Sequence, residues 1–374
     1  MRMTRRDWLG TWSVALAAGV PAFDVLAQAG RPMPKLISGD SPIEAKLAWP
    51  RDHAAHMDSR VEWWSFKGEL HPSAGKTLGF HVAIIRSQVE SAQESKSRFA
   101  PKHVLAARAS LTDLDAREQW FDQRVARLGF GLADVAEKEL DIRLHDWSLS
   151  RTAAGDASVF QGRILGKDFQ LDLKGTQAQP PLLHGEGGVL HRDPLLSYPT
   201  RYYSMPQLKV EGQVTLRRSR QNVSGSAWLD HGWGRRMMSP DAVGSDWVCM
   251  NLQDGGALVV FQMRRSDGTP SFAGAAWRRP GKPDQVFHSE EVKMKAGELW
   301  RSPASGGQYP VAWTLELAGT RYTVKARMRE QEVDGGNEIG DFFWEGLSDL
   351  TDAQGRLIGS GFLEMTGYSA ELAW

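Results

Sequence analysis

The sequence predicts an all-β protein built from antiparallel strands. Short runs in which apolar and polar residues alternate recur along the chain, and each run is closed by Gly, Asp or Asn. Segments such as QDGG, SDG and DAQG have the composition of hairpin turns. The 15 tryptophans suit half-buried pleated surfaces, and the 38 glycines suit turns and bulges. Helical patterns are few, and residues 115–138 are the main helix candidate.

The expected strands follow one another in two series. Residues 61–70 and 77–88 form a predicted hairpin, and the pattern continues in HVLAARASLTD, FQGRILG, FQLDLKG, LKVEGQVTL and NVSGSAWLD. The second half repeats the style in DWVCMNLQDGG, ALVVFQMRRSDG, SFAGAAWRR, VAWTLELAG, RYTVKARMRE, FFWEGLSDLTDAQG and LIGSGFLEMTGY. Regularly spaced short strands are typical of a sandwich or a barrel, and two sets of about eight strands would make two barrels. We place the boundary within GRRMMSPDAVGSD, so that residues 47–235 and 236–374 form two domains.

The N-terminus has the features of an export signal. Arginines precede a modest apolar stretch, and Ala27-Gln28-Ala29 offers a small-x-small cleavage site. The segment TRRDWL resembles a twin-arginine signal, a pathway that carries folded proteins. We therefore expect residues 1–29 to direct the protein to the periplasm, with 30–46 as an extended lead-in. An ordinary secretory signal or an uncleaved anchor is the alternative, and no later segment is apolar enough to span a bilayer.

Composition and charge exclude several functions. The 45 basic and 45 acidic side chains balance, so nothing indicates a nucleic-acid partner. The single cysteine, Cys249, allows no intrachain disulfide, and its apolar surroundings predict a buried structural thiol. The HxxH pair His53 and His56, and the pair His184 and His191, fit no metal-binding pattern. We therefore expect neither a metal nor another cofactor.

The densest candidate for chemistry is SAWLDHGWGRR, residues 226–236. A carboxylate at Asp230 could orient the imidazole of His231 and make it a general acid or base. Neighbouring residues of a strand point to opposite faces, so this pairing requires a turn, which Gly232 and Gly234 would allow. The structural alternative, in which Asp230 caps a loop at a strand end, has the stronger prior.

Three further clusters combine aromatic rings with polar groups. In EWW, Glu62 and Trp64 would share one face of a strand, and FFWEG contains the pair Trp344 and Glu345. A buried Glu beside an indole can have a raised pKa and act as an acid, or it can pair with an arginine as a structural plug. PTRYYSMP carries Tyr202 and Tyr203, whose hydroxyls would face a cavity or lie on a proline-fixed edge strand.

Several motifs, in order, carry a family resemblance: EWW, PPLLHGEGG, SYPTRYYSMPQLKVEGQV, GSAWLDHGWG, DWVCMNLQDGG, FFWEG and GSGFLEMTGY. Over about residues 50–369 the chain resembles the AttH-like family, to which the carotenoid 1,2-hydratases are related. The resemblance implies two lipocalin-like antiparallel β-barrels packed side by side, with a site near their junction. It also implies an isoprenoid-like or lipid-like hydrophobic ligand and, for bacterial members, an ABC transporter permease as partner.

The resemblance carries over to individual residues only in part. His231 and Trp233 match the His and Trp of the hydratase pattern. The Tyr and Asp of the following strand are replaced by Phe261 and Met263, which leaves His231 and Glu62 as proton donors. This substitution argues against carotenoid hydration itself.

The sequence leaves three functions open: an enzyme in which His231, positioned by Asp230, moves a proton; a periplasmic carrier of a lipid-like molecule; and a structural adaptor. The candidate catalytic residues are His231, Asp230 and Glu62. The candidate ligand-binding residues are Trp64, Tyr202, Tyr203, Trp228, Trp233, Phe261, Met263, Trp344 and Glu345.

Overall fold

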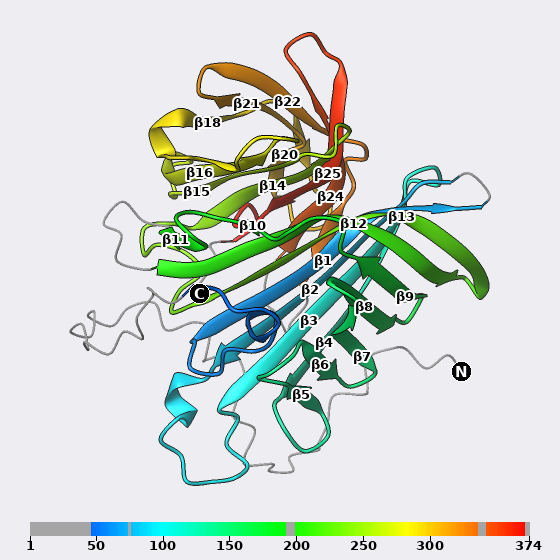
Figure 1. Ribbon diagram of the computed structural model, residues 1–374, viewed down its shortest axis with the longest axis vertical. Helices are drawn as coiled ribbons and strands as arrows, with labels where there is room; N and C mark the ends of the chain where they lie inside the picture. Colours follow the sequence, from blue (N-terminus) through cyan, green and yellow to red (C-terminus); the bar gives the residue numbers. More distant parts are fainter. Residues whose placement is uncertain (1–45, 74–75, 192–198, 336–341, 371–374) are drawn as a thin grey trace, which may run out of the picture.

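The computed structural model describes residues 46–73, 76–191, 199–335 and 342–370. The expected export signal and nearly all of the lead-in lie outside these residues. The regular secondary structure of the described chain is almost entirely antiparallel β-sheet, which confirms the all-β prediction (Figure 1). The helical segments among the described residues are three short 3₁₀ turns: η2 (Arg51–His53), η3 (Glu90–Ala92) and η4 (Ser289–Glu291). No described helix is long and apolar enough to cross a membrane.

The first sheet holds 13 strands among the described residues and curls into a nearly closed barrel. Its ends approach each other, since Arg124 Nε lies 3.3 Å from Asp146 Oδ1 and Arg124 Nη2 donates to the Leu165 carbonyl. The order is β4 (Glu118–Arg127), β3 (His103–Asp113), β2 (Leu78–Gln88), β1 (Val61–Pro72), β13 (Ser219–Gly234), β12 (Pro199–Leu216), β9 (Phe169–Thr176), β8 (Ala157–Leu165), β7 (Trp147–Ala154), β6 (Asp141–Leu144) and β5 (Ala133–Val135), with β10 (Leu182–Leu183) and β11 (Val189–His191) paired to β12.

The second sheet holds 10 strands of the described chain and begins at Gly244, after the first sheet ends at Gly234. Its order is β17 (Gln285–Phe287), β16 (Pro270–Arg278), β15 (Ala257–Arg264), β14 (Gly244–Leu252), β25 (Leu357–Met365), β24 (Phe342–Thr351), β22 (Thr320–Ala326), β21 (Ala312–Leu317) and β18 (Val292–Ala296), with β23 (Glu332–Asp334) paired to β24. The strands β19 (Leu299–Arg301) and β20 (Gln308–Pro310) form a separate pair.

The helix expected over 115–138 is wrong. Residues 118–127 form β4, which pairs with β3 along its whole length, and β5 follows. The long edge of β3 offers a row of unpaired backbone groups, and satisfying them outweighs a weak local helical pattern.

Three apolar clusters organise the packing. One fills the first barrel, one lies within the second sheet, and the third joins the two sheets. The third includes Tyr202, Trp228, Cys249 and Phe261, so both sheets contribute to it. Cys249 is buried there, as expected for a structural thiol, and burial raises the pKa of its thiol well above the usual range.

Strand β1 has two faces with different roles because successive side chains point to opposite sides of a sheet. Trp64 and Phe66 belong to the core of the first barrel. Ser65 lines the junction with the second sheet, and Lys67 contacts Glu364 of β25. A single strand thus supplies side chains to both the barrel interior and the junction.

Candidate functional site

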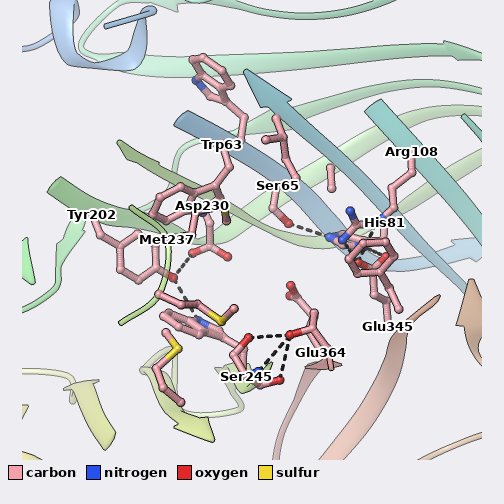
Figure 2. A pocket seen from close by; sticks show the side chains of 18 residues that line it. Trp63, Ser65, His81, Arg108, Tyr202, Asp230, Met237, Ser245, Glu345 and Glu364 are labelled. Carbon is pink, nitrogen blue, oxygen red and sulfur yellow. Dashed lines mark hydrogen bonds and ion pairs between the residues drawn. The ribbon is translucent and has the colours of Figure 1, made fainter. Parts of the chain in front are cut away.

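A cavity of about 130 Å³ lies where the outer face of the first barrel meets the second sheet. Figure 2 shows polar side chains from both sheets converging on it. Its apolar walls include Trp63, Met237, Trp247, Met263 and Phe343. Concave, mostly apolar surfaces with a few convergent polar groups are the usual form of small-molecule sites.

Pairing between strands decides which polar groups share the cavity. Ser65 of β1 lies opposite Asp230 of β13 on one side and opposite Ala83 of β2 on the other. His81 lies two residues before Ala83 on β2, so it falls on the same face as Ser65. Arg108 of β3 lies opposite Ala83 and extends this polar band.

A hydrogen-bonded relay runs through the cavity wall. Ser65 Oγ lies 2.7 Å from His81 Nε2, and His81 Nδ1 is hydrogen-bonded to Glu345 of β24 (Figure 2). Arg108 Nε donates to the other oxygen of Glu345 at 2.9 Å. The guanidinium of Arg108 also stacks 3.8 Å from the ring centre of Phe343. The relay is assembled from both sheets.

The charge state of Glu345 determines which ring nitrogen of His81 carries a proton. Burial opposes ionisation of this carboxyl, but Arg108 and His81 outweigh burial and hold the pKa of Glu345 far below its usual range. An ionised carboxylate only accepts hydrogen bonds, so Nδ1 of His81 carries a proton. In the neutral ring, Nε2 then carries no proton and accepts a hydrogen bond from the hydroxyl of Ser65. This is the proton arrangement of a base poised beside a hydroxyl.

A buried ion cluster lies next to the relay. Lys67 Nζ is 2.8 Å from Asp230 Oδ2 and also contacts Glu364 of β25, so it ties the two sheets together. Burial opposes the charge of Lys67, yet the nearby carboxylates outweigh burial and raise its pKa well above the usual range. Burial likewise opposes ionisation of Asp230, but Lys67 keeps the pKa of that carboxyl below its ordinary value.

The other carboxylate oxygen of Asp230 accepts hydrogen bonds from three neutral side chains. Oδ1 accepts hydrogen bonds from the hydroxyl of Tyr202 at 2.7 Å, from Ser204 Oγ at 2.5 Å and from Trp228 Nε1 at 2.8 Å. Asp230 is therefore held rigidly and remains ionised at the cavity wall.

The hypothesis that Asp230 orients His231, which required a turn between them, is wrong. Strand β13 stays extended through Gly234, so the two side chains point to opposite faces. Asp230 faces the junction, and His231 lies inside the first barrel, where its Nε2 is 3.0 Å from Glu62 Oε1. Gly232 makes no turn here. Instead it leaves room for the ring of Trp63, because a Cβ at this position would lie 2.3 Å from the indole.

His231 belongs to a second polar cluster, enclosed in the first barrel. Glu62 accepts hydrogen bonds from His231, from His56 Nδ1 at 2.8 Å and from Arg86 Nε at 3.0 Å. The hydroxyl of Tyr203 lies 3.2 Å from His231 Nδ1. Burial opposes ionisation of Glu62, but His231 and His56 outweigh it and hold the pKa of Glu62 far below its usual range. Glu62 therefore has no raised pKa of the kind that a buried acid catalyst requires.

Three residues of this cluster form a possible donor set for a metal ion. The ligand atoms of His56, Glu62 and His231 lie within 4.8 Å of one another, and two histidines with a carboxylate are a known donor set for divalent metals. Arg86 already neutralises the charge of Glu62. Nδ1 of His56 and Nε2 of His231 also donate hydrogen bonds to the Glu62 carboxylate. The three groups thus satisfy one another without an ion.

Because His53 is buried in the interior of the first barrel, we expect the protein to lose stability in mild acid. Burial, followed by the charge of Arg151, lowers the pKa of His53 from 6.5 to about 3. A depressed pKa contributes stability above 6.5 that is lost as pH falls towards 3, because the unfolded chain takes up the proton first. We expect the free energy of unfolding in urea to fall between pH 6.5 and 4.5. In His53→Gln the slope should be shallower by about 1.4 kcal/mol per pH unit. Equal slopes in the two proteins would contradict this assignment.

The structure distributes the sequence-predicted residues over four places. Asp230, Tyr202, Met263, Trp64 and Glu345 line the cavity. Trp233 and Tyr203 belong to the core of the first barrel, Trp344 lies in the core of the second sheet, and Trp228 and Phe261 pack in the cluster between the sheets. Phe261 stacks on Trp247 with ring centres 4.3 Å apart.

Four polar residues at the junction were not among the residues predicted from the sequence: Ser65, His81, Arg108 and Lys67. One signal for them exists, namely polar residues that alternate with aromatic and apolar ones within strands expected to be buried, as in EWWSFK and GFHVAII. Glu364, between Leu363 and Met365 in the expected strand LIGSGFLEMTGY, carries the same signal.

Fold and site together define an all-β protein of two curled sheets with a polar relay and an apolar cavity at their junction. The chain belongs to the AttH-like family, whose profile matches residues 42–368. An AttH crystal structure from Nitrosomonas europaea is 34% identical, covers 87% of this chain and 98% of its own, and has a TM-score of 0.81. Kievitone hydratase from Nectria haematococca shares the fold, with 14% identity, 87% and 94% coverage and a TM-score of 0.64. No curated protein sequence matches the chain.

Proposed function

We propose that this protein binds a hydrophobic, isoprenoid-like or lipid-like small molecule in the junction cavity and acts on it by acid–base chemistry of the hydratase or hydrolase type. The observation that carries the proposal is His81, an imidazole oriented by Glu345 and facing a cavity with aromatic and methionine walls. Met237 and Met238 at the wall are unbranched and adaptable, so the cavity can widen around a larger ligand.

His81 takes the acid–base role that the sequence suggested for His231. His231 is fully buried in the first barrel, where burial lowers its pKa and Glu62 only partly offsets that effect. His81 lines the cavity instead, with one ring nitrogen anchored and the other directed at Ser65. A general base must lie within hydrogen-bond reach of the proton that it moves, and His81 meets this condition.

A cavity-filling variant tests the binding site. Ala83 lines the cavity from β2, so Ala83→Leu should occupy the space and weaken binding of the fluorescent apolar probe N-phenyl-1-naphthylamine at least tenfold. The matched control is Ala153→Leu, the same change at an exposed position of β7, which should bind like the wild type. Unchanged binding by Ala83→Leu would place the ligand elsewhere and overturn the proposal.

The second candidate function is a non-catalytic carrier or an accessory protein of an ABC exporter. The apolar walls and adaptable methionines favour it, because they serve binding without chemistry. Wild type and His81→Ala should be incubated with total membrane lipid extract, and the bound and free molecules analysed by mass spectrometry. Turnover by the wild type but not by His81→Ala supports the enzyme, whereas a ligand retained unchanged by both supports the carrier.

Export to the periplasm is part of the proposal. It is supported by Arg5-Arg6 ahead of an apolar stretch and by the AQA segment at residues 27–29. Fractionation of cells that express the full chain tests it, since replacement of both arginines by lysine should retain the protein in the cytoplasm. Periplasmic recovery of that variant would contradict the twin-arginine route.

A further inference from the structure

Ser65 has the surroundings of the nucleophile in a serine hydrolase, because it lines a cavity and contacts a histidine. It lies in the middle of β1, lines the junction cavity and is 6% exposed. Its Oγ is 2.7 Å from the unanchored ring nitrogen of His81. A serine hydroxyl gains nucleophilicity when an adjacent base takes its proton and a third group holds that base.

The remaining two members of such a triad are also in place. Glu345 holds Nδ1 of His81 and therefore selects the tautomer that leaves Nε2 free to receive the Ser65 proton. Arg108 keeps Glu345 ionised, so the carboxylate can stabilise the imidazolium that forms when the proton moves. Such a constellation is recognised by its geometry and roles, since it recurs on unrelated folds with different chain order.

The charged groups at the cavity wall determine whether an anionic or a neutral substrate is favoured. The carboxylates of Asp230, Glu364 and Glu345 face or border the cavity, against the cations of Lys67 and Arg108. This excess of negative charge disfavours an anionic ligand such as a free carboxylate. The apolar walls at Trp247 and Met263 favour a hydrophobic group. A neutral ester with an apolar acyl or alcohol part fits both conditions.

We propose that Ser65, His81 and Glu345 form a nucleophile–base–carboxylate triad that hydrolyses neutral, hydrophobic carboxylic esters. Ser65 Oγ attacks the carbonyl carbon while its proton passes to His81 Nε2. The bond from that carbon to the alcohol oxygen breaks, and the leaving oxygen takes the proton from His81. Water, deprotonated by His81, then attacks the acyl-Ser65 ester and releases the acid, and the proton returns to Ser65. The net reaction consumes one ester and one water and yields one acid and one alcohol.

This inference rests on the proposed function, because it places the chemistry in the same cavity. The full chain should be tested with p-nitrophenyl acetate and p-nitrophenyl butyrate, and with a fluorophosphonate probe read by intact-protein mass and peptide mapping. We expect one probe per chain, attached at Ser65. Ser65→Ala should lose the label and lower kcat/KM at least 100-fold, on the scale seen when a triad member is removed. Ser110→Ala is the matched control, since Ser110 is a buried serine of β3, which pairs with β2, and it should keep both label and rate.

Glu345 is a positioning residue and needs a separate readout. Glu345→Gln should lower kcat by about 10³–10⁴, because an amide can donate to Nδ1 and stabilise the wrong tautomer of His81. Glu345→Asp should restore part of the rate with the wild-type pH profile. A merely structural role would leave the pH profile of Glu345→Gln unchanged, and that result would overturn the assignment of Glu345.

The outcomes separate this inference from the function on which it rests. Label and hydrolysis that persist in Ser65→Ala would overturn the triad, as would a wild type that neither reacts with the probe nor cleaves either ester. In both cases unimpaired binding of N-phenyl-1-naphthylamine, lost in Ala83→Leu, would leave the cavity intact as a ligand site. If the wild type and Ala83→Leu bound N-phenyl-1-naphthylamine equally well, the proposed function itself would be overturned.

Discussion

Replacing Lys67 by methionine is expected to lower the free energy of unfolding by about 3–5 kcal/mol. Lys67 is almost fully buried between the two sheets, and its ammonium is the counter-charge for Asp230 and Glu364. Methionine matches the length of the lysine stem but leaves both carboxylates without their counter-charge. Removing one member of a buried ion pair is costly because the remaining charge stays desolvated. Urea unfolding followed by tryptophan fluorescence measures the change.

A second-site change should relieve most of this loss. In Asp230→Asn the side-chain oxygen still accepts from Tyr202, Ser204 and Trp228, while the negative charge is gone. The double variant with Lys67→Met then lacks the buried unpaired charge at Asp230, and Glu364 is partly exposed and can be hydrated. We expect the double variant to be more stable than Lys67→Met alone. If the two losses simply add, Lys67 does not act through Asp230.

Replacing Glu62 by glutamine should cause a loss of similar size inside the first barrel. Glu62 and Arg86 are completely buried and form an ion pair at 3.0 Å, so Gln leaves the guanidinium of Arg86 without its counter-charge. We expect a decrease of about 3–5 kcal/mol in the free energy of unfolding, measured in urea. The double variant Glu62→Gln with Arg86→Met removes both charges and should recover part of the stability.

The single variant Glu62→Gln also shows whether Glu62 is a structural residue or a catalytic acid. Glu62 lies in the barrel interior with His56 and His231, whereas the relay of Ser65 and His81 lines the junction cavity. At a temperature where Glu62→Gln is still folded, we expect the binding of N-phenyl-1-naphthylamine to match the wild type. Loss of ligand turnover without loss of stability would contradict the structural assignment and restore Glu62 as a catalytic residue.

The sequence by itself determined the all-β class and the family. Alternation of apolar and polar residues is a local property, and it follows directly from the two-residue period of a strand. The same period already predicted that Asp230 and His231 would separate unless the chain turned. The family resemblance rested on several motifs in order, of which GSAWLDHGWG supplies residues to both the barrel interior and the junction.

The site was decided by tertiary structure. Ser65 and His81 are 16 positions apart, and Glu345 comes 264 positions after His81, from the other sheet. No spacing within a strand encodes such a meeting, because strand pairing brings Ser65 and His81 together and sheet packing then adds Glu345. The charge states were also decided there. The sequence left two states open for the buried glutamates, a raised pKa or pairing with an arginine. In the structure Arg86 and Arg108 lie beside Glu62 and Glu345, and attraction between opposite charges outweighs the desolvation of the carboxylates.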